Sequence, residues 1–181
     1  MTSAYMANRL WLWGCLSVTA LWITLVAGVS AQGRPPMPFD HVHLSVPEPD
    51  AGAAWYAKYF GGVAEPPRVR FGPTLFSFIK RAGSPPSAGG VIDHVGFSVS
   101  DLDAAIARFE ADGVKILTPP REVPGLFKLA FVEDPWGTKI EVVQDAEFPG
   151  FHHVHLMGSD PEALLAWYQA TFGGTDRKST R

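Results

Sequence analysis

Cysteine is almost absent from this chain, and it has no long run of positively charged residues. The only cysteine, Cys15, lies in an apolar stretch near the N-terminus. The rest of the chain therefore offers no disulfide, no thiol nucleophile and no thiolate metal ligand. The 15 Lys and Arg residues against 18 Asp and Glu give a net charge of −3, without a basic patch that would bind nucleic acid. We therefore expect no nucleic-acid partner and a fold stabilised by packing.

Residues 1–31 have the composition of an export signal. Arg9 is their only charged residue, an apolar run follows over 10–29, and the segment ends in the small residues Ser30 and Ala31. We therefore predict a signal peptide over 1–31 and an exported protein, periplasmic or secreted. The apolar run is also long enough to span a bilayer, so an uncleaved anchor is the alternative. Only in that case do we expect contact with a membrane.

A repeat organises the rest of the chain. Residues 39–62 and 151–174 share 13 of 24 positions without a gap, including an HVHL core and a Phe-Gly-Gly ending. Residues 92–114 are a weaker third copy. In each copy apolar residues first alternate with period two, as in a strand, and then recur at helical spacing before a glycine. Each copy therefore predicts a strand followed by a helix.

Further strands are predicted after the first two copies. The candidates lie at 68–71, 74–80, 114–117, 127–133 and 138–143, the last two joined by an Asp-Pro-Trp-Gly turn. Two modules of strand–helix–strand–strand–strand result, module one over 39–80 and module two over 92–145, in one domain over 39–145. Asp50 and Asp101 are the expected N-caps of the two helices.

The remaining segments are expected to be connections or incomplete parts. We predict a linker over 32–38, flexible joints over 81–90 and 144–150, and a tail over 175–181. The third copy, 151–174, lacks the strands that follow the other two. We therefore expect an incomplete third module that is loosely held or swaps into a neighbouring chain.

Two histidines and one carboxylate project from strand faces turned away from the helices. His41 and His94 take equivalent places in the first two copies, and Glu141 lies on the polar face of the strand over 138–143. Two imidazoles with one carboxylate suit Fe(II), and also Mn, Ni, Co or Zn, with coordination positions left open. A lone histidine in a strand is usually structural or solvated, so the combination of the three indicates a divalent metal site.

At these residues the sequence resembles the glyoxalase, bleomycin-resistance and dioxygenase superfamily, also called the vicinal oxygen chelate superfamily. The similar segments are the DHV strands with His41 and His94, and DPWGTKIEVV with Glu141. The resemblance implies an α+β fold in which paired βαβββ modules form a curved mixed sheet, shaped as a cup around one metal ion. It also implies that His41, His94 and Glu141 are the metal ligands, and that a small-molecule substrate chelates the ion through neighbouring oxygens.

The sequence departs from several branches of this superfamily. The strand over 74–80 offers only Ser77 and Lys80, so the fourth protein ligand of glyoxalase I and methylmalonyl-CoA epimerase is absent. Phe131 stands where ring-cleaving dioxygenases have a tyrosine, and residues 115–130 contain no histidine. His43 stands where fosfomycin thiol transferases have a threonine. The choice among lyase, isomerase and dioxygenase chemistry is therefore left open.

His43 shares a strand face with His41, two residues away. It is the candidate catalytic residue, as a general base or a substrate contact, and it is also an alternative to His41 as a ligand. A half-exposed side chain without a role is the third interpretation. His153 and His155 repeat the pair in the third copy, where we expect them on an incomplete surface.

These features favour a metal-dependent enzyme that acts on a small substrate with neighbouring oxygens. One alternative is a non-catalytic binding or resistance protein of the bleomycin-resistance type. Another is a truncated fragment of a longer two-domain member of the superfamily. The repeat would also allow a homodimer that forms through module or half-module pairing.

Overall fold

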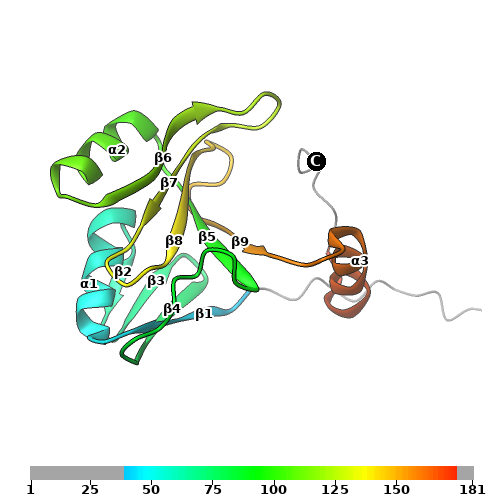
Figure 1. The fold of residues 1–181 in the computed structure, drawn as a ribbon, viewed down its shortest axis with the longest axis horizontal. Coiled ribbons are helices and arrows are strands. Elements are labelled where there is room, and N and C mark those ends of the chain that lie inside the picture. Colours follow the sequence, from blue (N-terminus) through cyan, green and yellow to red (C-terminus); the bar gives the residue numbers. More distant parts are fainter. Residues whose placement is uncertain (1–38, 175–181) are drawn as a thin grey trace, which may run out of the picture. The chain divides into compact units, whose positions relative to one another are not determined.

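The computed structural model describes residues 39–174, in which nine strands and three helices follow the repeat of the sequence (Figure 1). The predicted signal peptide at 1–31, linker at 32–38 and tail at 175–181 lie outside the described residues. Over the described range, no helix has the length and apolar character needed to cross a membrane.

Module one has the predicted strand–helix–strand–strand–strand pattern. Its elements are β1 (His41–Val46), α1 (Pro49–Phe60), β2 (Val63–Glu65), β3 (Arg68–Phe71) and β4 (Thr74–Lys80). They form a sheet in the order β1-β4-β3-β2, in which β1 runs parallel to β4 and the other pairs are antiparallel. Only β2 was not predicted specifically, because a strand of three residues is too short for alternation to be recognised.

Module two repeats this arrangement. Its elements are β5 (Ile92–Ser98), α2 (Leu102–Ala111), β6 (Lys115–Glu122), β7 (Lys128–Glu133) and β8 (Lys139–Gln144). They pair in the same relative order within a five-stranded sheet, β6-β7-β8-β5-β9. The α+β class and the two βαβββ modules are therefore confirmed.

The third copy forms β9 (Gly150–Leu156) and α3 (Pro161–Phe172). β9 pairs antiparallel with β5 and so extends the sheet of module two (Figure 1). The expectation of a loosely held strand is wrong, because β9 pairs with β5 along most of its length. α3, in contrast, contains no buried residue.

Aromatic side chains of α1 join the two modules. Phe60 stacks on Phe97 of β5 with ring centroids 4.1 Å apart, and Tyr59 meets Phe109 of α2 at 5.0 Å. Phe97 is fully buried and also contacts Phe76 of β4. The apolar strand faces are thereby buried in one core, because side chains alternate along a strand. The opposite face of module two carries the polar residues His94 and Glu141.

One helix cap agrees with the prediction and the other does not. The carboxylate of Asp101 accepts a hydrogen bond of 3.0 Å from the Ala104 amide, as an N-cap does. Asp50 lies inside the first turn of α1, whose N-cap is Glu48 without a side-chain hydrogen bond. The prediction for Asp50 is wrong because Pro49, with its fixed φ, already begins the helix.

The segment over 81–90 is attached to module two and is not a free joint. The Ser87 amide donates to the Gly137 carbonyl at 2.9 Å, and the Ser87 hydroxyl donates to the Asp93 carbonyl at 2.8 Å. The Lys139 amide in turn donates to the Ser87 hydroxyl at 2.9 Å. These bonds hold the segment beside the first strand of module two.

Candidate metal centre

Three adjacent strands bring a carboxylate and two imidazoles together. Gly96 of β5 is paired with Glu141 of β8 on one side and with His153 of β9 on the other, and His94 precedes it by two residues on the same face. Nε2 of His94 lies 2.9 Å from Oε2 of Glu141, and Nε2 of His153 lies 3.0 Å from the same oxygen. The ligand atoms of all three residues lie within 4.8 Å of one another.

This group fits a divalent metal ion in both donor chemistry and spacing. Two ligand atoms bound next to each other on one ion at about 2.1 Å lie about 3 Å apart, which matches the two measured distances. His94 and Glu141 are buried, with 5% and 8% of their surfaces exposed. Buried ionisable groups are costly unless they are paired or bind a metal, so their convergence indicates a site.

Glu141 carries the charge that a cation site requires. Burial opposes its ionisation, but hydrogen bonds from His153 and His94, with the charge of those imidazoles, outweigh burial and lower the pKa of Glu141 to about 2. His155 stacks on His94 with ring centroids 4.5 Å apart. Burial and the neighbouring charges of His94 and His153 lower the pKa of His155, which favours its neutral form.

The buried carboxylate of Asp93 orients His94. Its Oδ2 lies 2.7 Å from Nδ1 of His94 and accepts a hydrogen bond of 2.6 Å from Lys139. Its Oδ1 accepts from the Gly89 amide at 2.7 Å. Burial opposes the charge of Asp93, but these donors together hold its pKa well below the usual range. With Nδ1 held in this way, Nε2 of His94 faces Glu141, as in metal-ligating histidines oriented by a carboxylate.

A second histidine orients His153. Nδ1 of His152 lies 2.7 Å from Nδ1 of His153, and Nε2 of His152 lies 3.2 Å from the carboxylate of Asp145. Each imidazole of the site therefore has an outer partner: a carboxylate for His94 and an imidazole backed by a carboxylate for His153. Such partners fix the tautomer and the direction of a ligand.

Gly96 makes the space that the His153 ring occupies. A Cβ atom at position 96 would overlap the ring atoms of His153. The pairing of β5 with β9 is also irregular between Gly96 and Phe97. This irregularity lets Phe151 pack in the core beside Phe97, at 5.8 Å, while His153 faces the site.

The structure brings together two of the three predicted ligands and adds His153. His41 lies outside this group of described residues: its side chain is 48% exposed, and its Nδ1 lies 2.5 Å from Asp40. The reason is the strand order, because β9, not β1, is the neighbour of β5. The set of His41, His94 and Glu141 stays a prediction that the structure does not test.

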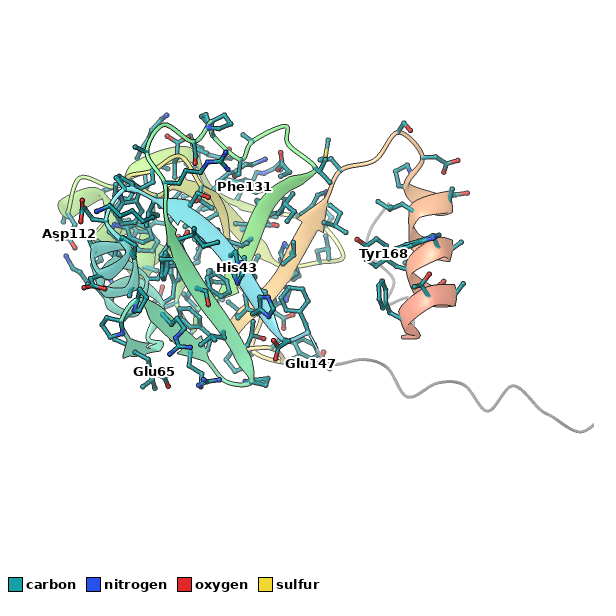
Figure 2. The ribbon with its side chains drawn as sticks, turned by 90° about the horizontal axis from the view of Figure 1, so that it is seen from below. His43, Glu65, Asp112, Phe131, Glu147 and Tyr168 are labelled. Carbon is teal, nitrogen blue, oxygen red and sulfur yellow. The ribbon has the colours of Figure 1, made fainter. Side chains whose placement is uncertain are left out.

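His43 lies on β1 (Figure 2). The centroid of its ring is 4.7 Å from that of His41, as expected for residues on one strand face. His43 lines the cavities that border His94 and His153, and His41 lines the second of these. Neither residue is part of the His94–Glu141–His153 group. The expectation that His153 sits on an incomplete surface is wrong, because β9 is part of the sheet. The repeat in the sequence could have indicated His153 as a candidate ligand, since FHHVHL aligns with FDHVHL and puts His153 at the position of His41.

Comparisons with known proteins agree with this architecture. A model of the Glyoxalase/Bleomycin resistance protein/Dioxygenase superfamily matches residues 39–142. A search of the curated proteins finds none that matches the chain. Among solved structures, a glyoxalase I variant from Zea mays is similar with a TM-score of 0.58 and 20% identity, over 72% of this chain and 54% of that chain. The oxidase ChaP-H1 is similar with a TM-score of 0.50 and 19% identity, over 61% of this chain and 98% of that chain.

At these identities the structural similarities show the fold alone. This chain spans about half the length of the glyoxalase I that it resembles.

Proposed function

We propose that this chain, which belongs to the Glyoxalase/Bleomycin resistance protein/Dioxygenase superfamily, is a metal-dependent enzyme acting on a small substrate with neighbouring oxygens. The observation that carries the proposal is the convergence of buried His94 and Glu141 with half-buried His153, in which each histidine has its own outer partner. Three protein ligands leave positions open for a substrate. Lyase, isomerase and dioxygenase chemistry are all compatible with such a centre.

Each residue of the site would have its own role. His94, Glu141 and His153 would hold the ion, which when bound would supply Lewis acidity at a substrate oxygen. His43 is the proposed acid–base residue, because it lines both cavities beside the site, one bordering His94 and the other bordering His153. Asp93 would keep His94 in the tautomer that presents Nε2 to the ion.

A non-catalytic binding protein is the second candidate. The cavity that borders His153 has a volume of about 710 Å³, which is enough to enclose a small molecule. A pure binding protein would not need three converging ligands whose two histidines each have an outer partner. The complete donor set therefore favours the enzyme.

Metal binding to single-residue variants tests the proposal. We expect one divalent ion per chain in the wild type, and a loss of affinity of at least about 100-fold in His94→Ala, Glu141→Ala and His153→Ala. His41→Ala is the matched control and should bind as the wild type does. The measurement is calorimetric titration with Zn²⁺ or Ni²⁺, with bound metal checked by elemental analysis.

The outcomes separate the alternatives. Loss of metal in His41→Ala with retention in His153→Ala would establish the set predicted from the sequence. No stoichiometric ion in any of the proteins would contradict the metal-dependent function and favour a binding protein. Turnover of hemithioacetals, catechols and 2-oxoacids by each metal form would then define the reaction class.

A further inference from the structure

Two cavities border the metal centre and share three lining residues, Val42, His43 and Ile92. The larger, of about 710 Å³, borders His153, and the smaller, of about 280 Å³, borders His94. His43 lines both of them. A molecule that reaches the site can therefore extend in two directions from one point.

The larger cavity is apolar except for histidines. Its lining residues include no Asp, Glu, Lys or Arg. The apolar residues of the lining are Phe39, Val42, Ile92, Phe151, Val154, Leu156 and Tyr168. Figure 2 shows His43 and Tyr168 on two of the elements that contribute to it, β1 and α3. A wall of this kind favours a ring-sized apolar group, since each apolar area buried contributes binding energy and no charge in the wall requires a partner.

The smaller cavity has several polar residues in its lining besides His94. Arg81, Ser84 and Ser87 line it together with Trp136. The Ser87 hydroxyl is already bonded, but the Ser84 hydroxyl oxygen is buried and has no hydrogen-bond partner among the described residues. A buried unpaired hydroxyl costs free energy unless something binds it. Arg81 lies in the same lining, and an anionic ligand oxygen is the group that would suit both a hydroxyl donor and an arginine.

We propose that the substrate is a small carboxylic acid that carries a ring-sized apolar group and a second oxygen on the carbon next to the carboxylate. The apolar group would occupy the cavity between β1 and β9, and the carboxylate would face Arg81 and Ser84. The two neighbouring oxygens would lie at His94, Glu141 and His153. This inference rests on the proposed metal-dependent function and names the substrate class for that same site.

Three small molecules test the apolar group and the carboxylate of the proposed substrate separately. Mandelate has the ring, the carboxylate and the neighbouring oxygen; lactate lacks the ring; 1-phenyl-1,2-ethanediol has the ring and neighbouring oxygens but no charge. Binding to the Ni²⁺-loaded full chain is measured by calorimetry, so the readout does not depend on turnover. We expect mandelate to bind about 10- to 100-fold more tightly than either of the other two.

Two variants with matched controls locate the parts of the ligand. Leu156→Ser, which lines only the larger cavity, should remove most of the advantage of mandelate over lactate, whereas Leu117→Ser, the same change at an exposed residue outside both cavities, should not. Arg81→Gln should weaken mandelate and lactate about 10-fold and leave the diol unchanged, whereas Arg121→Gln should change none of them.

Each result that contradicts the proposal points to a different part of it. Equal affinity of the metal-loaded protein for mandelate and lactate would overturn the apolar part, and equal affinity for mandelate and the diol would overturn the carboxylate part. Either result would leave the metal centre standing. Absence of Ni²⁺ binding in the first titration would instead contradict the proposed function and, with it, the substrate class.

Discussion

Position 96 carries a glycine where the other two copies of the repeat carry histidine, His43 and His155. The difference has a physical reason in the structure. The ring of His153 crosses the strand at this position to reach Glu141, and any side chain at 96 would occupy the same space. A single missing Cβ therefore lets two copies of one module place their equivalent histidines, His94 and His153, on one carboxylate.

Gly96→Ala should displace His153 without removing any ligand atom. We expect Zn²⁺ affinity to fall on the order of 100-fold, close to the effect of His153→Ala, while the fold is retained. Competition with a Zn²⁺ chelator measures the affinity. Gly158→Ala is the control, because its Cβ would meet only the flexible end of Leu164 at 3.1 Å.

A double variant makes this prediction sharper. In the His153→Ala background, Gly96→Ala should cause no further loss of affinity, because the ring it displaces is gone. Wild-type affinity in the Gly96→Ala single variant would show that His153 is not a ligand.

Tyr56 joins module one to module two through a buried hydrogen bond. Its hydroxyl donates to Asp134 at 2.9 Å, and the other oxygen of Asp134 accepts from the Trp136 and Thr138 amides, both at 2.8 Å. Burial and the neighbouring Asp134 charge raise the pKa of Tyr56 well above its usual value, so the hydroxyl stays protonated and donates.

Tyr56→Phe should lower the free energy of unfolding by about 1.5–3 kcal/mol, because the buried carboxylate loses a donor. Tyr59→Phe is the matched control. Its hydroxyl bonds to Asp112 at 3.0 Å near the surface, where Lys58 also pairs with Asp112 at 2.9 Å, so we expect a loss of only about 0.5 kcal/mol. Urea denaturation measures both, and equal losses would contradict a special role for Tyr56.

At the scale of elements, β9 and α3 come from the same copy of the repeat but contribute differently. β9 is hydrogen-bonded to β5 and places Phe151 against Phe76 at 5.2 Å. α3 repeats the Ala-Trp-Tyr sequence of α1, yet Tyr168 of α3 is 38% exposed, whereas the equivalent Tyr56 of α1 is fully buried. The difference arises because α1 packs on the sheets of two modules, and α3 buries none of its residues.

Two truncations should show how much β9 and α3 each contribute to thermal stability. A chain that ends after Gly158 loses α3 but keeps β9, and its melting temperature should change by no more than about 2 °C. A chain that ends after Asp145 also loses β9, and should melt about 10 °C lower because Phe151 and the strand pairing are lost. Calorimetry or circular dichroism measures the midpoint. Equal midpoints for the two truncations would mean that β9 is not integral to the sheet.

At the scale of the whole molecule, export stays a proposal. We propose that the chain is exported and cleaved after Ala31, because a basic residue, an apolar run and small residues follow one another at the N-terminus. Mass spectrometry of the protein released by a cell that expresses the full chain should then give a mature N-terminus at Gln32. Recovery of the intact chain in the membrane fraction would support the anchor instead.

A homodimer formed through module or half-module pairing also stays a prediction. The exposed aromatic residues of α3, Trp167 and Phe172, would be buried in such an assembly.

Much of the fold could be predicted because its signals are local. Alternation along residues 41–46 and 92–98, helical spacing over 102–111, and the Asp-Pro-Trp-Gly turn each depend on neighbours in the sequence. The candidate site was predicted in part for the same reason. His94 and Glu141 belong to strands of one module, and strand alternation alone puts both on the polar face.

The sequence by itself determined the repeated module, the polar face of each strand and the residue types that suit a metal ion. Only the tertiary structure decided which of two equivalent first strands lies beside β5, and therefore that His153 lies next to Glu141. The reason is that His41 and His153 lie in nearly identical segments, so local pattern cannot rank them. The choice between the two histidines as candidate ligands follows from long-range packing, because β9 occupies the edge of β5 and Phe151 packs in the core beside Phe97.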